Sequence, residues 1–326
     1  MSANPVLCLV EQDDEGVIEA SRRALSVANS FAATFDATLV AVLIGDVASS
    51  TLASLSRFAV SSAWRVTWDD LDVYAPVAWA RALTDLAAQT SASAVVAAGT
   101  DRGNEVLAHA GALANLPMVA NCFSASRVDS DTVALSRQRW AGSLLEDATL
   151  TSPLALLTVA FDGVTALEVA EPHLVPISEF RAELDPADLA VRVADWTKRP
   201  GGISLAEAKV VVGGGRGVGS AEAFASLDEL AGLLNAAVGV SRAVTSLGWR
   251  SHSQQVGQTG TRISPDLYLA AGISGATQHL AGCQSAKIVV AINTDADAPI
   301  VSRADYAIIG DLNAIVPALV TAIRAR

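Results

Sequence analysis

Two clusters of glycine, hydroxyl and amide residues lie close together in the last quarter of the sequence. The first cluster reads Q-V-G-Q-T-G over residues 255–260, and the second reads G-I-S-G-A-T-Q-H over residues 272–279. Glycine allows the backbone to approach a ligand closely, and consecutive free N–H groups in such turns form a concavity that binds anions. Because the two clusters flank one short apolar run, Leu267–Ala271, they predict a shared ligand with more than one polar end.

A glycine-rich turn, G-G-G-R-G-V-G-S, occupies residues 213–220, between an expected strand at 208–212 and an expected helix at 221–234. A strand, such a turn and a helix N-terminus form a general phosphate site, to which Arg216 would add a fixed cation. As a dinucleotide fingerprint the turn is incomplete, because its sixth position is Ser220 and no acidic residue for a ribose follows in residues 237–240. An NAD-dependent oxidoreductase that uses the turn at Gly213 is therefore the alternative, not the first interpretation.

Polar residues also follow the other expected strands of the C-terminal part. Ser241 and Arg242 come directly after the run 238–240, Asn293 follows the run 288–292, and Asp311 follows the run 307–309. In an open parallel sheet, ligands bind beyond the carboxyl ends of the strands. The pattern predicts a doubly wound, Rossmann-like domain whose ligand site collects these side chains.

The N-terminal part alternates between apolar runs and helical periods, as parallel α/β domains do. Expected strands lie at 6–10, 38–44, 65–68, 94–98, 153–160 and 166–169, and expected helices lie at 20–35, 78–88 and 105–116. Alternating residues at 119–128 and 132–140 predict an antiparallel extension of the sheet. The sequence K-R-P-G-G at 198–202 has a proline followed by two glycines, which is typical of a linker. It predicts a boundary between an N-terminal α/β domain, residues 1–200, and a second domain, residues 201–326.

The formal net charge of −12 is confined to the N-terminal domain. Residues 201–326 contain nine basic and nine acidic residues, and subtracting these from the totals of 22 and 34 leaves 13 and 25 for residues 1–200. Nucleic-acid binding is not expected, because it requires clusters of basic residues. The acidic domain is a solvated surface or a docking face for a basic partner.

The remaining sequence features point to a cytoplasmic protein that is not embedded in a membrane and holds no metal. No apolar run is long enough for a membrane span, and the N-terminus meets Glu11 and Asp13 too early for a secretion signal. Cys8, Cys122 and Cys283 lie far apart and outside any C-x-x-C pattern, so neither a disulfide framework nor a zinc site is predicted.

One longer pattern resembles a known family. The run L-Y-L-A-A-G-I-S-G-A-T-Q-H-L-A-G at 267–282, followed by V-V-A-I-N at 289–293, is similar to the signature of the electron transfer flavoprotein α subunit. Q-V-G-Q-T-G, G-G-R-G at 214–217, S-R-A at 241–243 and A-P-I-x-x-x-A-D-Y at 298–306 occur in that family's order. The resemblance covers residues 208–326, whereas residues 1–200 share only the α/β alternation and the W-A-G at Trp140.

The resemblance implies an electron carrier that transforms no organic substrate of its own. It implies a heterodimer with a β subunit that carries AMP or, in bifurcating relatives, a second FAD. The resemblance also implies that the second domain of this chain holds most of the FAD and that the N-terminal domain docks the partner. Electrons would pass from flavoprotein dehydrogenases to a quinone oxidoreductase or a similar acceptor. Carried over by position, the FAD-binding residues would be Arg216, Ser241, Arg242, Gln255, Val256, Gly257, Gln258, Thr259, Ser274, Gly275, Ala276, Thr277, Gln278, His279, Asn293, Asp311 and Leu312.

The resemblance also implies roles for some of these residues. Arg242 and His279 would lie near the isoalloxazine, where positive charge and hydrogen-bond donors raise the flavin potential. A histidine, only partly charged near neutral pH, would act more weakly than arginine. Thr259 would face N5, the turn at 272–275 would hold the pyrophosphate, and Asn293 and Asp311 would lie toward the ribose or adenosine. A nucleotide-binding regulatory module is a further alternative, which would need no arginine beside a flavin.

Overall fold

A computed structural model describes residues 4–69, 73–142, 144–160, 163–194, 204–206 and 208–325. The chain divides into two compact units, residues 1–196 and residues 197–326, and each is described by itself. The boundary predicted at 198–202 lies outside the described residues.

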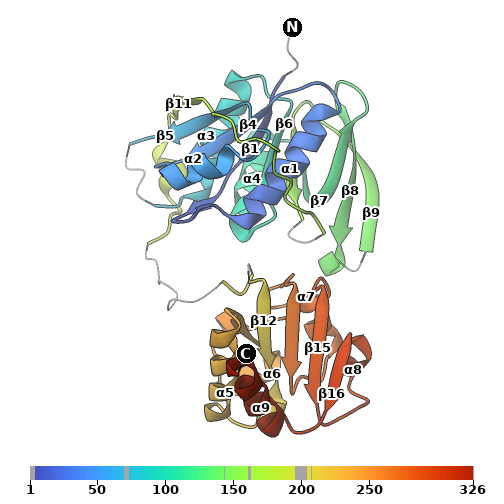
Figure 1. The fold of residues 1–326 in the computed structure, drawn as a ribbon. Helices are drawn as coiled ribbons and strands as arrows, with labels where there is room; N and C mark the ends of the chain where they lie inside the picture. Colours follow the sequence, from blue (N-terminus) through green and yellow to red (C-terminus); the bar gives the residue numbers. More distant parts are fainter. Residues whose placement is uncertain are drawn as a thin grey trace. The chain divides into compact units, whose positions relative to one another are not determined.

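The N-terminal unit is built on one large sheet. Its strands are β1 (Val6–Leu9), β4 (Leu39–Ile44), β5 (Ser62–Thr67), β6 (Ala94–Ala98), β7 (Met118–Arg127), β8 (Thr132–Arg139), β9 (Leu144–Thr151), β10 (Ala155–Val159) and β11 (Ile177–Arg181). Among the described residues they are ordered β11-β5-β4-β1-β6-β10-β7-β8-β9 (Figure 1). The strands from β11 to β7 pair in parallel, whereas β8 and β9 extend the sheet in antiparallel pairing, so the predicted extension is confirmed.

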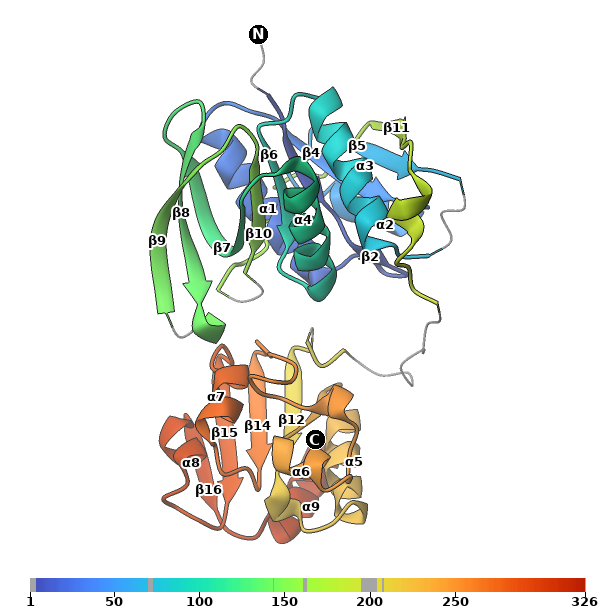
Figure 2. The ribbon, with the colours of Figure 1, turned by 180° about the vertical axis from the view of Figure 1, so that it is seen from behind.

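Helices cover both faces of this sheet. Helices α1 (Glu19–Ala33) and α2 (Ser49–Leu55) pack on one face, and α3 (Pro76–Gln89) and α4 (Asp101–Ala114) pack on the other, as the two opposite views show (Figures 1 and 2). The central strands are buried on both sides because they are almost wholly apolar, as in the L-V-A-V-L-I of β4. A short hairpin, β2 (Gln12–Asp13) with β3 (Gly16–Val17), follows β1.

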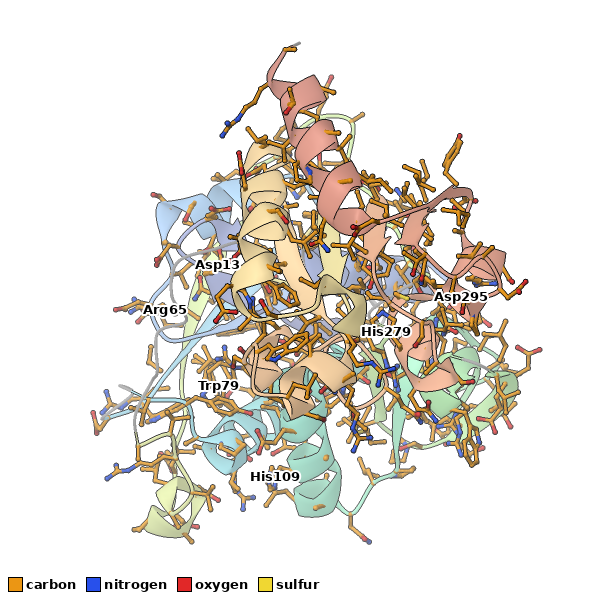
Figure 3. The ribbon with its side chains drawn as sticks, turned by 90° about the horizontal axis from the view of Figure 1, so that it is seen from below. Asp13, Arg65, Trp79, His109, His279 and Asp295 are labelled. Atoms are coloured by element: carbon orange, nitrogen blue, oxygen red, sulfur yellow. The ribbon has the colours of Figure 1, made fainter. Side chains whose placement is uncertain are left out.

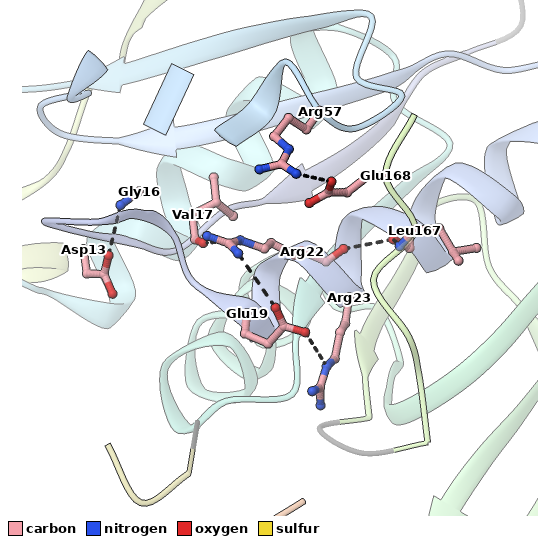
Figure 4. A network of polar contacts seen from close by, with 10 residues as sticks. Asp13, Gly16, Val17, Glu19, Arg22, Arg23, Arg57, Leu167 and Glu168 are labelled. Atoms are coloured by element: carbon pink, nitrogen blue, oxygen red, sulfur yellow. Dashed lines mark hydrogen bonds and ion pairs between the residues drawn. The ribbon is translucent and has the colours of Figure 1, made fainter. Parts of the chain in front are cut away.

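One predicted strand of this unit is wrong. Residues 166–169 form no strand but an extended strap that crosses α1 (Figure 4). The Leu167 N–H donates to Ser26 Oγ at 2.8 Å, and Glu168 forms an ion pair with Arg57. The Val169 N–H donates to the Arg57 carbonyl at 2.8 Å. The backbone of this apolar run is therefore satisfied by a helix side chain and a loop, not by a neighbouring strand.

The C-terminal unit is a doubly wound α/β domain, which confirms the predicted class. Its strands are β12 (Val210–Gly214), β13 (Ala237–Val240), β14 (Leu267–Ala271), β15 (Ile288–Asn293) and β16 (Tyr306–Ile309). In the described part of the chain they are all parallel and ordered β13-β12-β14-β15-β16. Its helices are α5 (Ala225–Leu233), α6 (Arg242–Ser246), α7 (Thr277–Cys283), α8 (Pro299–Arg303) and α9 (Leu312–Arg324). Helices α5, α6 and α9 pack on one face of the sheet, and α7 and α8 pack on the other.

The glycine-rich turn begins two residues later than its sequence suggests. Gly213 and Gly214 are the last residues of β12, and the turn starts at Gly215. A Cβ at Gly213 would lie 2.5 Å from the hydroxyl of Tyr268, and one at Gly214 would lie 2.3 Å from the ring of Phe224. Because these two glycines have no side chain, the aromatic rings can pack closely against β12. The two glycines are not part of the turn.

Candidate functional site

The ends of the five strands of the C-terminal sheet align in register. Gly214 is paired with both Val240 and Ala271, and Ala271 is paired with Ile292. Asn293 is paired with Ile309. The segments that follow these strands therefore emerge at one edge of the sheet. Strand β12 lies between β13 and β14, and the helices that follow β12 and β14 cover opposite faces. Such a topological switch point opens the crevice where open α/β sheets bind ligands.

The predicted site residues all follow these strand ends or lie beside them. Arg216 follows β12; Ser241 and Arg242 follow β13; Gln255, Val256, Gly257, Gln258 and Thr259 form a loop beside the end of β13; Ser274, Gly275, Ala276, Thr277, Gln278 and His279 follow β14; Asn293 ends β15; and Asp311 and Leu312 follow β16.

The turns after β12 and β14 touch directly at the switch point. The Gly215 N–H donates to the Ala271 carbonyl at 2.9 Å, and the Gly217 N–H donates to the Gly272 carbonyl at 3.0 Å. A Cβ at Gly215 would lie 2.1 Å from the Gly272 oxygen, which no real structure tolerates. Gly272 itself has φ of 63°, and Gly275 has φ of 80°, both in the left-handed region that favours glycine. Only glycine lets these two turns come together.

The loop 255–259 links helices α6 and α7. The buried side chain of Gln255 accepts a hydrogen bond from Thr245 Oγ1 in α6 at 2.7 Å and donates from Nε2 to Thr259 Oγ1 at 3.1 Å. The Gln258 N–H donates to the Gln278 carbonyl, at the start of α7, at 2.8 Å. Because Thr259 accepts a bond from Gln255, its own hydroxyl proton remains free for another acceptor.

His279 lies in the first turn of α7 and is buried (labelled in Figure 3). Its Nε2 is 2.8 Å from the hydroxyl of Tyr268, whereas its buried Nδ1 makes no hydrogen bond within the described residues. Burial lowers the pKa of His279 to about 4, and an interaction of the ring with the Val256 backbone, which lacks the geometry of a full hydrogen bond, opposes this shift only in part. The expectation of a partly charged histidine is therefore wrong for this chain, since the ring is neutral near pH 7.

Arg216 and Arg242 are two exposed cations of this edge. In the segments that the structure covers, neither guanidinium forms an ion pair, whereas Arg250, Lys287 and Arg324 of the same unit each do. A guanidinium with no carboxylate partner at a strand end is available to an anionic ligand.

Three further predicted site residues make contacts within the protein itself. Asn293 donates from Nδ2 to the Ile273 carbonyl at 2.8 Å, and Asp311 caps α9 by accepting from the Asn313 N–H at 2.9 Å. Leu312 is buried, and its side chain packs in the core. Asn293 and Asp311 thus also shape the loops around the edge.

These features fit an anionic ligand with several polar groups, such as a dinucleotide. The glycine turns allow a pyrophosphate to approach, two unpaired guanidinium groups balance negative charge, and a buried ring nitrogen lacks a partner. In the described ranges, no group of histidine, cysteine and carboxylate residues gathers to hold a metal ion.

The sequence matches of both units agree with this geometry. Residues 6–185 match the electron transfer flavoprotein domain, and residues 204–284 match the electron transfer flavoprotein FAD-binding domain. The chain belongs to the electron transfer flavoprotein family. The expected FAD-binding domain is thereby confirmed, and an NAD-dependent oxidoreductase is not supported.

Relatives from distant organisms extend this match over most of the chain. The electron transfer flavoprotein subunit alpha of Bacillus subtilis is 33% identical over 285 residues, 87% of each chain. That of Paracoccus denitrificans is 40% identical over 70% of this chain and 71% of its own. The mitochondrial subunit of Oryza sativa subsp. indica is 36% identical over 94% of this chain and 88% of its own. All three relatives are named as alpha subunits of electron transfer flavoproteins. In the part of the chain covered by the structure, no helix is long and apolar enough to cross a membrane.

Two residues of the site do not stand out in the sequence. Tyr268 reads as one more apolar residue of β14, and Thr245 reads as a helix-surface hydroxyl, yet they bond to His279 and Gln255. A buried tyrosine hydroxyl normally has a partner, and this is the one signal that could have drawn attention to Tyr268.

The lowered pKa of His279 predicts a specific loss of stability in acid. The native ring stays neutral down to about pH 4, whereas an unfolded histidine takes up a proton below about pH 6.5. The contribution of His279 to the free energy of unfolding is fully present above about pH 6.5. It decreases as the pH falls from about 6.5 to about 4, by up to about 1.4 kcal/mol per pH unit. Urea unfolding measures this loss. Between pH 7 and pH 5, the free energy of unfolding should decrease by roughly 1–2 kcal/mol more in the wild type than in His279→Gln.

The exposed His252 offers the matched control for that measurement. His252→Gln should lose the same stability as the wild type between the two pH values. Equal losses for the wild type and His279→Gln would contradict the neutral, buried state of His279.

Proposed function

We propose that this chain is the α subunit of an electron transfer flavoprotein and holds FAD at the carboxyl edge of its second sheet. The observation that carries the proposal is that two glycine turns, two guanidinium groups with no ion pair among the described residues and a buried imidazole meet at one switch point. The family match of residues 204–284 supports FAD as the ligand.

The residues of the edge divide into two sets in this proposal. The touching turns at Gly215 and Gly272, with Arg216, receive the pyrophosphate, because backbone N–H groups and a guanidinium both bind phosphate oxygens. The rest of the pyrophosphate site is formed by Ser241, Gly257, Gln258 and the segment 274–278. Asn293 and Asp311 lie toward the ribose or adenosine.

Arg242, Thr259 and His279 form the second set, beside the ring. Bound FAD supplies a ring that takes up and releases electrons, and protein groups near it set its potential. The Arg242 guanidinium stabilises added negative charge, the free Thr259 proton is available to a ring nitrogen, and the neutral His279 can donate one hydrogen bond. Each of these contributions favours the reduced state over the oxidised state.

The other expected properties belong to the same proposal. Residues 1–200 dock a β subunit, which carries AMP, and residues 201–326 bind FAD. Flavoprotein dehydrogenases are the donors, a quinone oxidoreductase or similar protein is the acceptor, and the complex is cytoplasmic. The excess of 25 acidic over 13 basic residues in the N-terminal part supports docking to basic surfaces.

Co-expression with a β-type subunit tests this proposal. The purified complex should be a yellow heterodimer, and extraction should release FAD that is lost when the C-terminal site is altered. A colourless complex that binds NADH would contradict it. An α chain that purifies alone with full FAD content would contradict the role of the partner.

A further inference from the structure

The Tyr268 hydroxyl and the His279 imidazole form a pair inside the C-terminal unit. Tyr268 is the second residue of β14 and is 0% exposed, and His279 is 6% exposed. Tyr268 Oη is 2.8 Å from His279 Nε2, with the two rings tilted by 31°. Gly213 on the neighbouring strand makes room for this hydroxyl, because a Cβ there would lie 2.5 Å from Oη.

The surroundings decide which atom of the pair donates. Among the residues that the structure describes, Nε2 is the only hydrogen-bond partner of the Tyr268 hydroxyl. If Nε2–H donated to Oη, the phenolic proton would be buried without an acceptor, which is costly in a protein interior. The arrangement that satisfies both groups has the Tyr268 O–H donating to an unprotonated Nε2. Burial also raises the pKa of Tyr268 well above its ordinary value, so this proton stays on the phenol.

The other ring nitrogen must then carry the proton. A neutral imidazole whose Nε2 accepts a hydrogen bond has its N–H at Nδ1. In the described structure this Nδ1 is buried and makes no hydrogen bond of normal geometry, although the ring interacts with the Val256 backbone. A buried donor without a well-formed hydrogen bond, placed at the carboxyl edge of the sheet, indicates that a ligand atom completes its bonding.

We propose that Tyr268 is a positioning residue that holds His279 as the neutral tautomer with its proton on Nδ1, ready to donate to a carbonyl oxygen of the bound flavin. The last step rests on the proposed function, whereas the choice of tautomer does not. Tyr268 acts through His279 and does not itself touch the cofactor. The histidine then contributes an oriented N–H dipole, not a positive charge, to the potential of the ring.

Nitrogen-15 NMR of the imidazole rings in the FAD-loaded heterodimer tests the tautomer directly. The chain has only four histidines, so the spectrum of the His279→Gln variant assigns the signals of His279. In the wild type at pH 7, Nδ1 should be protonated and Nε2 should not. In Tyr268→Phe, which keeps the ring and removes the hydroxyl, the two tautomers should become mixed.

The flavin potential gives the second readout. Tyr268→Phe should raise the dissociation constant of reduced FAD relative to that of oxidised FAD by roughly 2- to 10-fold. The upper value corresponds to a fall of about 59 mV for a one-electron step. The matched control is Tyr306→Phe, because Tyr306 is 66% exposed on β16, and it should change neither readout.

Some outcomes would overturn this inference. A wild-type His279 protonated on Nε2, or on both nitrogens at pH 7, would contradict it even if Tyr268→Phe failed to fold. A folded Tyr268→Phe with an unchanged tautomer would do the same. If the tautomer is as expected but neither His279→Gln nor Tyr268→Phe shifts the potential, the positioning by Tyr268 stands and the proposed contact of His279 with the flavin is wrong.

Discussion

Replacement of Gly215 by alanine is expected to abolish retention of FAD. The added Cβ would lie 2.1 Å from the Gly272 oxygen and 2.7 Å from the Ile273 Cα, and both are backbone atoms that cannot rotate away. The two turns would have to separate, which breaks the hydrogen bond from Gly215 N–H to the Ala271 carbonyl. Overpacking of this kind costs roughly 1–3 kcal/mol or more. The ratio of FAD to protein after gel filtration and the midpoint of urea unfolding measure the two effects.

Gly232→Ala is the matched control for this substitution. Gly232 lies in α5, and a Cβ there would meet nothing within 4 Å. Alanine at this position should keep the full FAD content and stabilise the chain by about 0.5–1 kcal/mol, because glycine is the poorer helix former. If Gly215→Ala kept its FAD and its urea midpoint, the close contact of the two turns would not be needed for binding.

Arg242→Ala is expected to lower the midpoint potential of the bound flavin. Arg242 is exposed, begins α6 and has no ion-pair partner in the described part of the chain, so its charge is available to the ligand. A charge a few ångströms from the ring would favour the reduced, negatively charged state by on the order of 1–2 kcal/mol after allowance for solvent. Since a tenfold change in equilibrium corresponds to about 59 mV for one electron, the fall should be roughly 40–90 mV.

Two further variants separate charge from affinity. Arg242→Lys keeps the charge and should retain most of the potential, although it loses the planar fork. Arg216→Ala removes the guanidinium of the pyrophosphate turn and should weaken FAD binding roughly tenfold while the potential changes little. If a dithionite titration gave equal midpoint potentials for the wild type and Arg242→Ala, Arg242 would not lie near the flavin ring.

Most strand ends of the second domain could be predicted from the sequence because they are marked by local residues, whereas β12 ends two residues later than its glycines suggest. The apolar run Leu267–Ala271 is β14 itself, and Ser241, Asn293 and Asp311 occur where the sequence predicts polar residues beyond strands. Glycine content likewise predicts the close approach of backbone near residues 215 and 272. Each of these patterns can be recognised from a few consecutive residues of the sequence.

Features that depend on partners distant in the sequence could not be predicted in this way. The apolar run at 166–169 looks like a strand, yet its backbone bonds to Ser26 and to the loop at Arg57. The neutral state of His279 depends on burial, and its hydrogen-bond partner Tyr268 lies eleven positions away across a strand, a turn and a helix start. Residue type alone shows neither the burial nor the partner.

A structure of the heterodimer with its cofactor tests the central claim most directly. The measurement is the set of distances from the isoalloxazine to the Arg242 guanidinium, the Thr259 hydroxyl and His279 Nδ1. We expect all three groups to contact the same FAD, with its pyrophosphate at the turns after β12 and β14. A flavin bound elsewhere, or one that contacts none of these three side chains, would contradict the account.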